Sequence, residues 1–186
     1  MPLHPLPYKA ALPLVRKHLC LDEDPKTATL IGELREARRR GYLRLSELEA
    51  ICQWKSPRAI QHIRTNSASS VRAATCAALA TRSEKQRLEA LLRLNGVSVP
   101  MASAILMLLN PKRYGVIDIR VWELLYELGT VTKNAKGIAF GFNNWYQYLM
   151  IIRYLARTCD CTARDVERTL FAAHKNFQRG QLYARR

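Results

Sequence analysis

The sequence predicts an all-α fold, and two observations carry this prediction. Apolar residues recur at three- and four-residue spacing through most of the 186-residue chain, as they do along one face of a helix. The alternation of apolar and polar residues that a half-buried strand requires never persists for more than a few positions. The best strand candidate, residues 116–119, runs directly into a helical pattern. We therefore expect helices joined by short turns.

Helix boundaries follow from capping and stop signals. Residues 27–40 place apolar side chains on one helical face and end at Gly41, a typical helix stop. Ser46 is predicted to cap the next helix, and Ser56-Pro57 to begin another, since proline suits the first helical position. The other predicted helices cover about residues 14–21, 67–80, 83–94, 101–109, 119–128, 144–157 and 162–175.

The charge balance points to a polyanionic partner. The chain has 30 Lys and Arg against 15 Asp and Glu, so its formal net charge is +15. A compact chain this basic repels itself, which favours binding to a polyanion. No acid lies between Glu49 and Glu84 or between Glu127 and Asp160. Such stretches suit contact with phosphates, although each alone is also typical of a solvated helix face. Nucleic acid is the first candidate partner. Charge alone allows RNA in place of DNA, and it also allows an anionic membrane surface.

Composition also argues against several protein classes. The longest apolar stretch, residues 101–109, is far short of the ~20 residues that span a membrane. Prolines among the first seven residues argue against a signal peptide. The five cysteines match no zinc or redox spacing. We expect reduced thiols in a cytoplasmic monomer without a membrane partner, associated with the nucleoid if the source is a bacterium.

The most informative stretch, residues 94–106, joins two apolar-faced helices through a very short turn. Gly96 supplies a backbone conformation that other residues rarely adopt, and Val97 is expected to point inward. Ser98 is predicted to cap the second helix, with Pro100 in its first turn. Backbone amides at the turn and at the start of that helix suit a phosphate. The alternative is a tight helical hairpin that binds nothing.

These residues and the segment after them are similar to a known family. Residues 94–106 resemble the helix-hairpin-helix motif, apolar-x-Gly-apolar-Gly-x-x-x-Ala, placed at about residues 85–109. Residues 111–122 resemble the Val-Asp-x-x-Val stretch of the helix-hairpin-helix DNA glycosylase superfamily (HhH-GPD). Trp122, four residues after Asp118, makes the 8-oxoguanine DNA glycosylase branch the nearer likeness. The resemblance implies two helical subdomains with a cleft between them: a six-helix subdomain at 22–113 that carries the hairpin, and a second from 1–21 plus 114–186.

The resemblance implies a DNA N-glycosylase of base excision repair. Such an enzyme flips a damaged or modified base out of double-stranded DNA and hydrolyses its N-glycosidic bond. Asp118 aligns with the catalytic aspartate, whose carboxylate stabilises positive charge on the sugar. The alternative is that Asp118 only caps the helix that starts at Ile119. Gly96, Val97 and Ser98 take the role of binding the DNA backbone, with a structural monovalent cation at the hairpin carbonyls.

Two departures from the family pattern refine this expectation. Bifunctional members carry a lysine on the second hairpin helix that forms a Schiff base, and Pro100 stands at that position here. The resemblance therefore implies a monofunctional enzyme with water as nucleophile and no abasic-site lyase activity. Substitution by a lysine from elsewhere, such as Lys55, is the less favoured alternative. Only Cys159 and Cys161 are present where the iron–sulfur branch has four cysteines, so neither a cluster nor another required cofactor is expected. A non-catalytic helix-hairpin-helix DNA-binding protein is the alternative function.

The base pocket is less well marked in the sequence. Candidates for the pocket, or for a wedge between bases, are Gln53, Trp54, Lys55, Trp122 and Phe142. For Trp54, ordinary core packing is the favoured alternative. The mixture of glycine, aromatic and amide residues at 137–146 suits a wall that stacks on a base, and it also suits a loop that plugs aromatic rings into the core.

Overall fold

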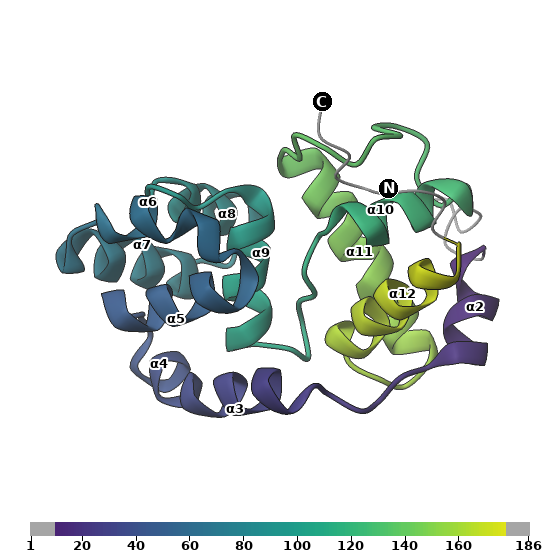
Figure 1. The fold of residues 1–186 in the computed structure, drawn as a ribbon, viewed down its shortest axis with the longest axis horizontal. Coiled ribbons are helices and arrows are strands. Elements are labelled where there is room, and N and C mark those ends of the chain that lie inside the picture. Colours follow the sequence, from purple (N-terminus) through teal and green to yellow (C-terminus); the bar gives the residue numbers. More distant parts are fainter. Residues whose placement is uncertain (1–9, 178–186) are drawn as a thin grey trace.

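The computed structural model describes residues 10–177, and within that range it contains helices and no strand, as the sequence predicts (Figure 1). The helices form two groups that lie side by side. The first group contains α3 (Pro25–Glu33), α4 (Arg35–Arg40), α5 (Leu45–Lys55), the 3-10 turn η1 (Pro57–Ala59), α6 (Ile60–Arg64), α7 (Ala68–Ala80), α8 (Glu84–Leu92) and α9 (Val99–Leu109). The second group contains α2 (Ala11–His18), α10 (Ile119–Glu127), α11 (Phe142–Thr158) and α12 (Ala163–Phe177).

The chain crosses between the groups twice. Helix α2, the first in the described sequence, packs on α11 and α12 in the second group. Residues 19–24 then lead across to α3, and residues 110–118 lead back from α9 to α10 (Figure 1). Among the described residues the first group has seven α-helices where six were expected.

Local capping explains most helix boundaries and corrects two of those predicted. Ser67 and Ser83, which stand at the predicted starts of two helices, cap α7 and α8 by accepting the backbone N–H groups of residues 70 and 86. The helix predicted over 27–40 instead breaks at Leu34, which is buried and turns α3 into α4. Ser46 is not a cap, because α5 already begins at Leu45. The Glu47 carboxylate accepts the backbone N–H of residue 44 at 2.6 Å and so closes that end.

Helix α9 lies at the centre of the first group. Every residue of α9 except Pro100 is buried, which explains why the helix is apolar all round. Packing on all sides therefore fixes the position of α9. The turn before α9 and the segment after it are held in place as a result. Within residues 10–177, no helix has the length and apolar character needed to cross a membrane.

Glu84 at the start of α8 joins the two groups. Its carboxylate accepts a hydrogen bond from Arg153 of α11 at 2.9 Å and from Arg113 at 3.1 Å, and it also pairs with Arg87 of its own helix. Burial alone would raise the pKa of Glu84. The hydrogen bond and charge of Arg153, with those of Arg113 and Arg87, outweigh burial and hold that pKa below its ordinary value.

Candidate active site

The turn between α8 and α9 is held tightly against α6. Gly96 has φ +78°, and a Cβ at this position would lie 2.9 Å from Cβ of His62 and 3.1 Å from the backbone N of Ile63. The amide side chain of Asn66 brackets Asn95: it donates to the Asn95 carbonyl at 3.0 Å and accepts the Asn95 N–H at 2.9 Å. Glycine is therefore required here both for its backbone conformation and for its lack of a side chain.

The predictions for the rest of the turn are confirmed in part. Val97 is buried, and Pro100 lies in the first turn of α9. Ser98 occupies the N-cap position, but its side chain makes no capping hydrogen bond, so that part of the prediction is wrong. The N–H of Val99, as the first residue of α9, has no acceptor within the helix and is free to face an anion.

Two of the hairpin carbonyls accept hydrogen bonds within the protein. The carbonyl of Leu94 accepts the Val97 N–H at 3.1 Å, and that of Asn95 accepts the Asn66 amide. A carbonyl oxygen has two lone pairs, so these bonds leave it able to face a cation as well. The expected monovalent cation stays a prediction, and no step below depends on one. Within residues 10–177, no cluster of three or more His, Cys, Asp or Glu side chains is arranged to hold a metal.

Asp118 stands at the N-cap of α10 and also faces the other helix group. Its Oδ1 accepts the backbone N–H of Arg120 at 2.8 Å, which is the capping bond that the sequence suggests. Its Oδ2 lies 3.4 Å from Nζ of Lys55, the last residue of α5. The side chains of Lys55 and Asp118 are 20% and 16% exposed. The pair therefore joins the C-terminus of a helix in the first group to the N-terminus of one in the second.

Two cavities meet at this ion pair. The hairpin cavity, of about 440 Å³, lies between the hairpin and the loop after α10. It is lined by Lys55, Ser56, Arg58, Ala59, Gly96, Ser98, Val99, Pro100, Met101, Asp118, Ile119, Gly137, Ile138, Ala139 and Phe140. The α12 cavity, of about 400 Å³, is lined by Trp54, Lys55, Val116, Asp118, Arg120, Arg164, Glu167, Arg168 and Phe171. Lys55 and Asp118 belong to both walls, and each cavity takes residues from both helix groups.

A buried ion-pair network forms part of the wall of the α12 cavity. The Glu167 side chain is 5% exposed and accepts a hydrogen bond from Nη1 of Arg164. Arg164 also donates to both carboxylate oxygens of Glu23, at 2.8 and 2.9 Å. Burial raises the pKa of the Glu167 carboxyl, and the charge of Arg164, which acts in the opposite direction, does not cancel this effect. The network fixes a carboxyl group and a guanidinium side by side on the cavity wall.

Aromatic and cationic side chains form the rest of that wall. Trp54 is half-buried, and its Nε1 donates to Oγ1 of Thr27 at 2.9 Å. The guanidinium of Arg120 lies over the ring of Phe171 at 5.1 Å, and within residues 10–177 Arg120 has no acid partner. A flat, polar ligand such as a nucleobase matches this combination of ring faces and hydrogen-bonding groups.

Three of the predicted base-pocket residues line neither cavity. Gln53 is exposed to solvent, whereas the next two residues of α5, Trp54 and Lys55, line the cavities. Trp122 is fully buried, and its Nε1 donates to the carbonyl of Asn134 at 2.9 Å, so it supports the loop after α10. Phe142 stacks on Tyr146 at 5.4 Å at the start of α11. Of the predicted set, only Trp54 and Lys55 belong to the cavity walls.

Helix α12 contributes a face to the site that was not predicted from the sequence. Arg164, Glu167, Arg168 and Phe171 share one helical face at three- and four-residue spacing. That spacing was available as a signal, because a face that mixes charges with an aromatic ring is neither a plain core face nor a plain solvent face. Its relation to Asp118 depends on packing between α10 and α12, which the sequence pattern does not state.

Comparison with known proteins adds no assignment, since no family model, no curated protein and no solved structure matches the chain.

Proposed function

We propose that the protein is a DNA N-glycosylase that acts on a base flipped out of double-stranded DNA. The observation that supports this best is the position of Asp118, a carboxylate on the wall shared by two cavities and beside a helical hairpin. The α12 cavity supplies ring faces and polar groups for a base. The hairpin cavity supplies amide groups and Arg58 for the adjoining phosphates.

The chemistry assigns Asp118 to the sugar. When the bond between C1′ and the base nitrogen breaks, the electron pair leaves with the base and C1′ gains oxocarbenium character. A carboxylate beside C1′ stabilises that positive charge, and it can orient the water that adds to C1′. The capping bond from Arg120 holds one carboxylate oxygen in place, so Oδ2 is the oxygen that faces the reacting centre.

A lesion panel tests this proposal. Duplexes that carry oxidised, deaminated, alkylated or mispaired bases are incubated with stoichiometric protein, and abasic sites are measured. At least one substrate is expected to react, and Asp118→Asn to abolish the reaction while DNA binding stays near the wild-type level. Asparagine is as good an N-cap as aspartate, so this variant keeps the start of α10. A panel without product would contradict the proposal and favour the alternative, a non-catalytic DNA-binding protein.

Lys55 supports a second candidate activity, cleavage of the strand at an abasic site. The sequence predicted water as the nucleophile because Pro100 replaces the hairpin lysine, but an amine from α5 lies 3.4 Å from Asp118. The Lys55 amine acts as a nucleophile only after Nζ has released a proton to water. The neutral amine then adds to C1′ of the open-chain sugar and water leaves, which gives an imine. Water then takes a proton from C2′, a C2′–C3′ double bond forms, and the C3′–O bond breaks with release of the phosphate on C3′.

Borohydride trapping separates the two nucleophiles. Duplex DNA with a preformed abasic site is incubated with the protein and sodium borohydride, which reduces an imine to a stable amine link. The wild type is expected to form a covalent adduct and Lys55→Gln to form none. Lys26→Gln is the matched control, because Lys26 is exposed on α3 and lines neither cavity. Absence of any wild-type adduct would leave water as the nucleophile.

A further inference from the structure

Ile138 is a large apolar residue exposed on the wall of the hairpin cavity. Its exposure is 53%, and it lines that cavity together with Gly96 and Ser98 of the hairpin and with Asp118. A single exposed apolar side chain is common on protein surfaces and by itself indicates nothing. Ile138 is distinguished by its backbone conformation and by the contacts that fix its position.

The backbone around Ile138 is fixed in an unfavourable conformation. Residues on both sides of it are left-handed: Gly137 has φ +57° and Ala139 has φ +50°. For alanine this conformation costs about 1 kcal/mol or more, so it persists only where the surroundings impose it. The amide side chain of Asn134 donates to the Ile138 carbonyl at 2.9 Å and accepts the Ile138 N–H at 3.4 Å. Both backbone polar groups of Ile138 are thus satisfied while its side chain points outward.

The loop that carries Ile138 is anchored to α10. Trp122 of α10 donates from Nε1 to the Asn134 carbonyl at 2.9 Å. The ring of Phe140 packs edge-on against the Trp122 ring, with 5.4 Å between the ring centroids. A Cβ on Gly137 would lie 3.3 Å from side-chain atoms of both Ile119 and Trp122. Because α10 begins directly after Asp118, this packing sets the position of Ile138 relative to the candidate catalytic carboxylate.

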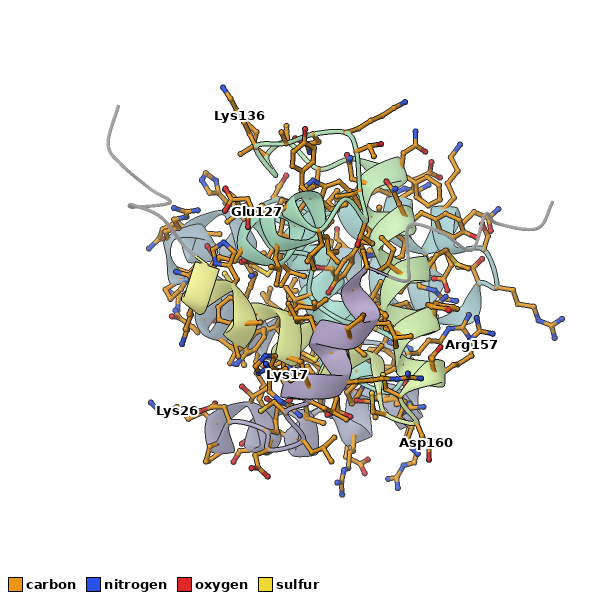
Figure 2. The ribbon with its side chains drawn as sticks, turned by 90° about the vertical axis from the view of Figure 1, so that its right-hand side faces the viewer. Lys17, Lys26, Glu127, Lys136, Arg157 and Asp160 are labelled. Carbon is orange, nitrogen blue, oxygen red and sulfur yellow. The ribbon has the colours of Figure 1, made fainter. Side chains whose placement is uncertain are left out.

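Positive charge surrounds the exposed side chain. Lys133 and Lys136 flank it on the same loop, and Figure 2 shows the Lys136 side chain extending away from the helices. Arg58 lines the same cavity, and no acid occurs in the sequence between Glu127 and Asp160. An apolar tip among cations complements a duplex, whose charged backbone encloses apolar stacked bases.

We propose that Ile138 is a wedge that enters the base stack and fills the space left by the flipped nucleotide. This role rests on the proposed function, since it requires a flipped nucleotide in the adjoining cavity. Ile138 is not among the five residues predicted from the sequence for the pocket or the wedge, and one of those five, Trp122, supports the loop that carries Ile138.

A binding experiment tests the wedge without bond cleavage. The full chain is titrated with an intact duplex and with the same duplex carrying a tetrahydrofuran abasic analogue, which leaves a gap in the stack. A 2-aminopurine base opposite the analogue reports local unstacking by its fluorescence. The variants are Ile138→Ala and Ile138→Leu. Leu21→Ala is the matched control, because Leu21 is 64% exposed and lines neither cavity.

The wild type is expected to prefer the gapped duplex and to raise the 2-aminopurine fluorescence. Ile138→Ala should weaken that preference about tenfold, because a smaller side chain buries less apolar surface, and Ile138→Leu should retain it. Leu21→Ala and binding to the intact duplex should not change. The wedge is overturned if the wild type shows no preference, if Ile138→Ala retains it, or if Leu21→Ala loses it equally. Neither readout needs an abasic product, so failure of the lesion panel and failure of the wedge are separate results.

Discussion

Nζ of Lys55 and Oδ2 of Asp118 lie 3.4 Å apart although the two residues are 63 positions apart in the sequence and belong to different helix groups. Both side chains are mostly buried, so the surrounding protein screens their attraction less than water would. The pair therefore joins the two helix groups at the carboxylate to which the proposed chemistry is assigned.

A double-mutant cycle on this pair should measure its contribution to stability. Lys55→Gln and Asp118→Asn are each expected to lower the free energy of unfolding by about 1 kcal/mol, because each leaves the partner charge unpaired. The double variant should lose less than the sum of the two, with a coupling of about 1 kcal/mol in urea denaturation. Strictly additive losses would show that the two charges do not interact in solution.

Replacing Gly96 by alanine should destabilise the hairpin more than the same change at Gly41. Both glycines have positive φ, but a Cβ at Gly41 meets nothing within 4 Å, whereas one at Gly96 collides with α6. Gly41→Ala is expected to cost about 1 kcal/mol for the backbone conformation alone. Gly96→Ala should cost about 2 kcal/mol more, because His62 and the α6 backbone must shift. Thermal or urea unfolding measures both, and equal losses would mean that the turn is not held as described.

Glu84→Gln should loosen the contact between α8 and α11. We expect a loss of about 2 kcal/mol at pH 7, since three arginines lose their charged acceptor. The pKa of Glu84 is lower in the folded protein than its ordinary value of 4.5, so its stabilising effect is complete above that value and is lost as the pH falls through the folded pKa.

The difference between wild type and Glu84→Gln should therefore narrow below about pH 4.5 in urea titrations at several pH values. Glu36→Gln is the control: Glu36 pairs with Arg39 on an exposed helix surface and should cost less than about 0.5 kcal/mol. A pH-independent difference would argue against the ionised Glu84 network.

Arg58 should contribute to the salt dependence of duplex binding. It is exposed on the hairpin cavity, where the proposed function places the DNA backbone. Loss of one phosphate contact in Arg58→Ala should reduce the slope of log K against log salt by about 0.9. Arg39→Ala is the control, because Arg39 is exposed on α4 and lines neither cavity. An equal change in both variants would indicate diffuse attraction rather than a defined contact.

Local signals predicted much of the fold. Ser67, Ser83 and Asp118 cap helices as the sequence indicates, because a capping bond spans only two or three residues. The prediction for Ser46 was wrong because α5 begins at Leu45, where Glu47 closes the helix end by accepting the backbone N–H of Arg44, two residues before Ser46. The break at Leu34 was missed because no stop signal stands at this residue, where the backbone departs from the helix with φ −79° and ψ −1°.

The parts of the candidate site that were predicted from the sequence are those that lie within one continuous segment. Gly96 and the hairpin follow from a continuous stretch, and Asp118 from a motif directly after it. The face of α12 and the role of Ile138 depend on contacts between segments far apart in the sequence, so no spacing rule could state them.

The helical class, the position of most caps and the hairpin turn follow from local sequence, because these depend on interactions between residues close along the chain. Which side chains meet Asp118 depends instead on how the folded helices pack. Gln53, Trp122 and Phe142 lie away from the cavities, and Lys55 lies 3.4 Å from the carboxylate. Helices pack by burying their apolar faces, and this packing sets the direction of the polar side chains at the boundary between the two groups.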